Sequence, residues 1–115
     1  MKNANNLLMV YCTCPDHKTA IEMAEGIVDA QLAACINIVP GLTSIYSWQG
    51  KRQQGSEELL LIKTSSQAYP ALEKHIVASH PYELPELIAV SIDAGLPAYL
   101  DWVSESCALT PRLDA

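Results

Sequence analysis

The chain has 115 residues, half of them hydrophobic, which is typical of one compact domain and predicts a single domain over residues 1–115. Its formal net charge is -6 and no basic run is present, so nucleic acid and membrane surfaces are poor partners. The polar start and the short apolar run after it fit neither a signal peptide nor a spanning helix. We therefore expect a cytoplasmic protein, whose 4 cysteines stay reduced.

The first half of the chain predicts a strand, a helix and a long hairpin. The continuous apolar run from Leu7 to Cys14 is typical of a strand buried on both faces. Asp16 can cap a following helix, in which apolar residues from Ala20 to Leu32 recur at helical spacing. A second strand carries a bend or bulge at Pro40-Gly41, and Gln49-Gly50 predict the tight turn of a hairpin.

The second half completes a six-element pattern. The hairpin returns as an apolar strand that ends near Thr64, and Ser65-Ser66 are cap candidates for a second helix with Pro70 in its first turn. A strand from Leu87 to Ile92 and a short helix opened by Pro97 follow. The order strand, helix, strand, strand, helix, strand predicts an α+β, ferredoxin-like βαββαβ sandwich with an extended hairpin and a C-terminal helix.

This topology leaves one face of the sheet without helices. An apolar sheet face of that size is rarely left in water by a monomer. The hairpin from Leu42 to Glu58 should also overhang the shorter strands and carries Tyr46 and Trp48 near its tip. Pairing between copies of such an arm can close into a ring that buries the bare faces, so we expect a homotrimer.

The stretch VYCTCPDH contains the candidate metal ligands. Strand alternation places Cys12 and Cys14 on one face, where they can share either a metal ion or a hydrophobic core. Buried free cysteine is common in cores, and no second cysteine pair completes a tetrahedral zinc site. His17 could approach Cys14, but a polar residue on the first turn of a helix is usually solvated.

A second group of candidates suggests a cleft between subunits. The segment SHPYELPE is stiffened by two prolines and presents Tyr82 and Glu86. Lys63 lies on the same strand face as Glu57 by parity and could point into a cleft with Trp48. The alternatives are a stiff connection and a solvated strand end.

The sequence lacks the common catalytic motifs. It contains no Gly-rich phosphate loop, no His-Glu-x-x-His and no nucleophile elbow. Acylphosphatases share the topology, but the connection CPDHKT has no arginine and places Asp16 where an anion would bind. We therefore expect a protein that is not an enzyme.

Several segments together resemble one family. VYCTCPD, LAACINIVPGLTSIYSWQGK, ELLLIKT, SHPYELPEL and YLDWV are similar, in this order, to the divalent-cation tolerance (CutA) family. The resemblance covers nearly the whole chain from Val10 to Val103. It implies a ferredoxin-like homotrimer, similar in shape to the PII signal proteins, associated with copper binding and divalent-metal tolerance and with no established reaction.

The resemblance also implies metal ligands. Family members that bind metal have a cysteine where Cys12 stands and adjacent histidines just before Pro-Tyr. Here those two positions are Ser79 and His80, and serine is a poor ligand for a soft or borderline ion. We therefore expect Cys12 and His80 to bind copper or another divalent metal, with Cys14 at most auxiliary and no organic cofactor. The alternative is a trimeric PII-like small-molecule sensor or assembly scaffold.

Overall fold

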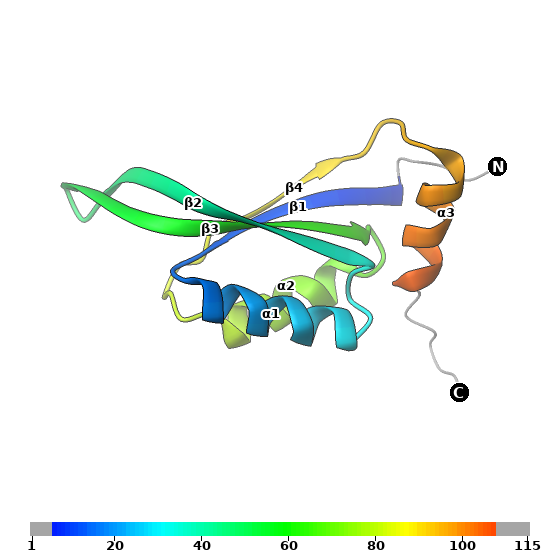
Figure 1. Ribbon diagram of the computed structural model, residues 1–115, viewed down its shortest axis with the longest axis horizontal. Helices are drawn as coiled ribbons and strands as arrows, with labels where there is room; N and C mark the ends of the chain where they lie inside the picture. Colours follow the sequence, from blue (N-terminus) through cyan, green and yellow to red (C-terminus); the bar gives the residue numbers. More distant parts are fainter. Residues whose placement is uncertain (1–5, 108–115) are drawn as a thin grey trace.

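The structure is a computed structural model that describes residues 6–107 (Figure 1). Seven elements follow the predicted order, including the predicted C-terminal helix. They are β1 (Leu7–Cys14), α1 (His17–Asp29), β2 (Cys35–Trp48), β3 (Lys51–Ser65), α2 (Tyr69–Ser79), β4 (Leu87–Ser91) and α3 (Pro97–Ser106).

The four strands form one sheet in the order β2-β3-β1-β4, and every neighbouring pair is antiparallel. Helices α1 and α2 lie side by side on one face of this sheet, and α3 lies at its end (Figure 1). The predicted α+β ferredoxin-like fold is confirmed. The prediction of one domain over residues 1–115 includes the chain ends, which lie outside the described residues.

The hairpin of β2 and β3 is the longest part of the molecule and projects beyond the other strands (Figure 1). Its strands have 14 and 15 residues, against 8 in β1 and 5 in β4. The predicted bulge is present as a register shift between Val39 and Leu42, where Gly41 has φ 79°. At the tip, Gln49 and Gly50 both have positive φ, which matches the twist of a two-residue hairpin turn.

The core lies between the sheet and the two helices that cover it. Strand alternation directs every second side chain of β1 and β3 toward α1 and α2. The main buried cluster therefore combines strand and helix residues, among them Val10, Cys12, Cys14, Leu60, Ile62, Ala20, Met23, Ile27, Leu72 and Ile76. A second cluster packs α3 against the start of β1 through Leu7, Leu100, Val103 and Cys107.

The two helix starts differ from each other. Asp16 caps α1 as predicted, because its carboxylate accepts a hydrogen bond of 2.8 Å from the Thr19 N–H. The prediction that Ser65 or Ser66 caps α2 was wrong, because β3 continues through Ser65 and α2 begins only at Tyr69. Ser65 instead accepts a hydrogen bond from the N–H of Ala68, which shapes the turn between strand and helix.

Candidate functional site

The end of β1 brings two thiols together beneath α1. Cys12 and Cys14 lie on the helix-covered face of the sheet and are both fully buried in the main core cluster. The Cys14 thiol donates to the Met23 thioether, with 3.7 Å between the sulfur atoms. The Cys12 sulfur lies 3.8 Å from the Thr13 carbonyl oxygen. This arrangement is compatible with both interpretations of the cysteine pair, core packing and metal binding.

The two thiols are chemically unequal. A hydrogen bond between their side chains raises the pKa of Cys12 far above its ordinary value, and burial raises it further. The same hydrogen bond lowers the pKa of Cys14. Since the thiolate is the form that binds metal, Cys14 is the more readily available ligand of the two.

His80 is buried and uses both of its ring nitrogens. Its Nε2 lies 2.8 Å from the Thr13 carbonyl, which can only accept, so Nε2 carries the proton and donates. Its Nδ1 accepts a hydrogen bond of 3.0 Å from the Tyr82 N–H. In this arrangement His80 has no free lone pair, and it could bind a metal with Cys12 only by giving up one of these bonds.

The described residues contain no ready-made cluster of ordinary metal ligands. Within residues 6–107, no three His, Cys, Asp or Glu side chains gather closely enough to hold one ion. A metal at the thiols would therefore need a low coordination number or a donor of another type. Methionine is such a donor, and Met23 already touches Cys14.

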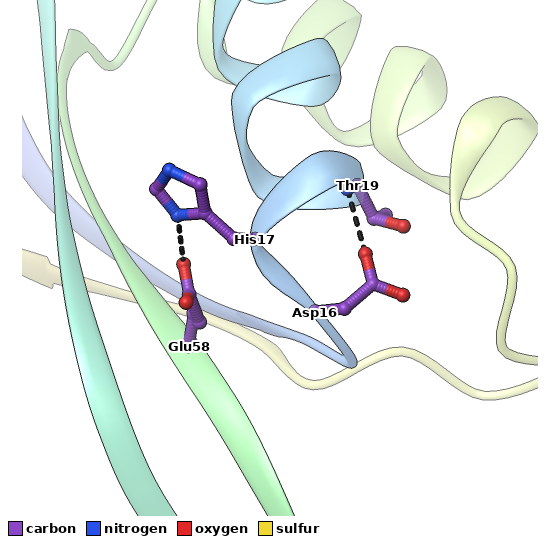
Figure 2. Close-up of polar contacts among 4 residues, drawn as sticks. All are labelled: Asp16, His17, Thr19 and Glu58. Atoms are coloured by element: carbon purple, nitrogen blue, oxygen red, sulfur yellow. Dashed lines mark hydrogen bonds and ion pairs between the residues drawn. The ribbon is translucent and has the colours of Figure 1, made fainter.

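His17 is not simply solvated, as the sequence suggested. Its Nδ1 lies 2.8 Å from the Glu58 carboxylate, so the first turn of α1 is joined to β3. Figure 2 shows the imidazole turned toward Glu58, while Asp16 turns the other way to cap Thr19. His17 thus contributes to structure at this position and is already partnered.

The residues predicted for a cleft are partly brought together. Trp48, Glu57, Tyr82 and Glu86 all line one groove of about 960 Å³ on the face of the sheet opposite α1 and α2. The Tyr82 hydroxyl donates a 2.8 Å hydrogen bond to Glu57, and burial together with this bond raises the pKa of Tyr82. Of the described residues that line the groove, three are glutamates and none is Lys or Arg.

Lys63 does not line this groove. It is buried six residues further along β3, roughly 20 Å from Glu57 at the rise of a strand. Its ammonium donates to the Asn37 side-chain oxygen and lies 3.9 Å from the Cys35 sulfur. Parity correctly predicted the shared face of Lys63 and Glu57, but it carries no information on distance along the strand.

No motif or spacing in the sequence singles out His75 or Met23 as a functional residue. Both line a small hollow of about 170 Å³ between α1 and α2, together with Thr19, Glu22 and Ser79. Helical spacing predicted Met23 as core. His75 comes from another helix, so only the packing of α2 against α1 reveals that the two meet.

Comparison with protein families matches residues 8–106 to the family described as CutA1 divalent ion tolerance protein. The divalent-cation tolerance protein CutA of Thermus thermophilus is 47% identical over 98 residues, which cover 85% of this chain and 95% of that protein. Mouse Protein CutA is 46% identical over 95 residues, and there the match spans 83% of this chain but only 54% of the relative. The chain thus spans about half the length of that relative.

Two findings concern location. None of the helices in the described part of the chain is long and apolar enough to cross a membrane. A solved CutA structure from Archaeoglobus fulgidus, 32% identical with a TM-score of 0.85 over 88% of this chain and 98% of its own, is described as periplasmic. The expected cytoplasmic location therefore stays a prediction.

Solved structures agree with the sequence matches. The divalent cation tolerance protein (Cut A1) of Thermus thermophilus superposes with a TM-score of 0.85 at 46% identity, over 87% of this chain and 97% of its own. The similarity includes the ferredoxin-like sheet described above. With the family match over residues 8–106, this places the chain in the CutA1 family of divalent ion tolerance proteins.

Proposed function

We propose that the protein binds copper, or another divalent metal ion, through the thiols at the end of β1, as part of metal homeostasis in the cytoplasm and without catalysing a reaction. The observation that carries this is the placement of Cys12 and Cys14 on one face of β1, where both thiols are buried in the same cluster beneath α1. Thiolate ligands suit copper far better than magnesium or calcium. The family's description as divalent ion tolerance proteins supports the same function.

The cysteine pair can be tested against the other thiols of the chain. Copper is titrated anaerobically into the wild type and into Cys12→Ala and Cys14→Ala. Because Cys35 and Cys107 are also free thiols, Cys35→Ala and Cys107→Ala are matched controls. We expect copper binding to be lost in Cys14→Ala, weakened in Cys12→Ala and retained in both controls. Equal binding by all five proteins would place the metal elsewhere.

The same copper titration also tests whether His80 is a ligand. The resemblance predicts that His80 joins Cys12 as a ligand, whereas the geometry gives both of its nitrogens to hydrogen bonds. In this proposal His80 is therefore not a ligand, and its hydrogen bond to the Thr13 carbonyl serves the stability of the fold. If the copper complex has one imidazole donor and His80→Ala loses that donor, His80 is a ligand after all.

The proposed working form is a homotrimer. Its support is the open face, defined here as the side of the sheet away from α1 and α2. That face exposes Ile88 by 55%, Val90 by 47% and Val39 by 37%. At the hairpin tip Ile45, Tyr46 and Trp48 are exposed as well. Apolar surface of this extent is typical of an interface between subunits.

The groove supports a second candidate function, the binding of a small molecule. Its aromatic side chains and its glutamates suit an organic cation better than a nucleotide or another anion, because ring faces and carboxylates both attract positive charge. A ligand that binds only the native protein raises its melting temperature. A thermal-shift screen that compares amines with anions tests this function. Stabilisation by anions alone would contradict it.

A further inference from the structure

Met23 and His75, which lie outside the predicted ligand set, line one hollow, and Met23 also contacts Cys14. The Cys14 and Met23 sulfurs are 3.7 Å apart and both side chains are buried, at 0% and 5% exposure. Met23 also lines the hollow between α1 and α2, and His75 forms part of the wall of that hollow. Met23 thus contacts the Cys14 thiol and also lines one hollow with His75.

The spacing of the two sulfurs already suits a shared ion. With metal–sulfur bonds of about 2.3 Å, two sulfurs 3.7 Å apart subtend an angle of about 107° at the metal. This is close to the tetrahedral value and within the range for three-coordinate sites. The separation of the two sulfurs is therefore compatible with one shared ion.

His75 supplies the third donor from the facing helix. Its ring packs against Gly26, where an added Cβ would lie 3.5 Å from the ring carbon Cε1. Gly26 is one helical turn from Met23, and Met23 and His75 both line the hollow between α1 and α2. The Nδ1 atom of His75 is buried and has no hydrogen-bond partner among the described residues. Buried polar atoms are normally paired, so this nitrogen lacks a partner that a metal ion or a water molecule would provide.

We propose that Cys14, Met23 and His75 form a binding site for monovalent copper. This site rests on the proposed copper function and names its donors. On binding, the Cys14 S–H bond breaks, its proton goes to solvent, and a sulfur–copper bond forms with no change of oxidation state. The resulting thiolate–Cu(I) unit is neutral, whereas a divalent ion with the same donors would leave a buried positive charge. Soft sulfur donors select the same ion.

Glu22 does not change the preference of this site for monovalent copper. It also lines the hollow, but its side chain is mostly exposed and lies 3.8 Å from the Lys18 ammonium. Its carboxylate is therefore solvated and already paired with a charge. The donors that remain in the buried part of the hollow favour copper in its lower oxidation state.

The test uses Cu(I) itself, supplied anaerobically and held in competition with bicinchoninate. Met23→Leu removes the thioether at nearly constant volume, and His75→Gln removes the imidazole. Met9→Leu on β1 and His17→Gln on α1 are matched controls that change the same residue types elsewhere. We expect at least tenfold weaker Cu(I) binding in Met23→Leu and in His75→Gln, and wild-type binding in both controls.

X-ray absorption at the copper edge gives a second, independent measurement. The wild type should show two sulfur donors and one nitrogen donor, and Met23→Leu should lose one sulfur. If wild-type protein binds no copper, the proposed function fails together with this site. If it binds copper through Cys14 but Met23→Leu is unchanged, only this site is overturned, and the metal lies at the cysteine pair. An all-sulfur complex that persists in His75→Gln overturns it as well, with water as the occupant of the hollow.

Discussion

Two histidines five positions apart show that hydrogen-bond partners, more than residue type, decide which side chain is available. His80 follows the end of α2, and both of its ring nitrogens form hydrogen bonds with backbone groups of Thr13 and Tyr82. His75 lies within α2, and its Nδ1 has no partner among residues 6–107. His80 therefore holds structure in place, while His75 retains capacity to bind.

The first prediction concerns His80. Its replacement by alanine leaves the Thr13 carbonyl and the Tyr82 N–H without their partners. We expect the free energy of unfolding to fall by about 2 kcal/mol, as for the loss of two buried hydrogen bonds. Urea unfolding at one fixed protein concentration measures this loss. Copper affinity should change little, and a large fall in affinity with unchanged stability would identify His80 as a ligand instead.

At the scale of elements, the predictions that succeeded rest on local patterns. Alternation in β1, the bulge near Gly41 and the turn at Gly50 depend on neighbours in the sequence, and each was predicted from them. Contacts between elements were harder to predict from the sequence. Met23 and His75 belong to different helices, so no periodicity indicates that they line one hollow. The two hydrogen bonds of His80 likewise depend on how the loop after α2 folds back onto β1.

The second prediction concerns the start of α1. Hydrogen bonding to Thr19 lowers the pKa of Asp16 below its ordinary value of 3.8. The charged cap therefore stabilises the fold fully above that value, and the contribution is lost as pH falls through the lower folded-state pKa. Asp16→Ala should lower the melting temperature by a few degrees at neutral pH, with the difference shrinking from about pH 5 to about pH 2.

Asp16→Asn separates the cap from its charge. Asparagine is an equally good N-cap but does not titrate in this range, so this variant should resemble the wild type at neutral pH. It should then lose less stability than the wild type on acidification. Melting curves recorded by circular dichroism across the pH series measure both effects. A constant gap between Asp16→Ala and wild type at every pH would show that the carboxylate charge contributes nothing.

At the scale of the whole molecule, helices cover one face of the sheet and leave the other face exposed. Helices α1 and α2 bury the apolar side chains on their side of the sheet, but the open face and the hairpin remain exposed within this single chain (Figure 1). The groove lies on that same open face and is lined partly by the hairpin. Assembly through this face would bring a second copy beside the groove, so oligomerisation and ligand binding are expected to be coupled.

The last prediction tests that assembly. Trp48 is 39% exposed near the hairpin tip, and a large aromatic side chain in such a position can anchor a neighbouring subunit. Truncating an anchor of this kind commonly costs about 2 kcal/mol or more of binding free energy. Trp48→Ala should therefore shift the protein from trimer toward monomer on dilution, measured by sedimentation velocity over a concentration series.

Val77→Ala is the matched control, because Val77 is exposed by 60% on α2, the helix layer on the opposite side of the sheet. It removes apolar surface that the proposed trimer does not bury, so its sedimentation should follow the wild type at every concentration. Equal dissociation of the two variants would mean that the hairpin is not the contact. A wild-type protein that stays a folded monomer at every concentration would contradict the proposed homotrimer. Another partner would then have to cover the open face.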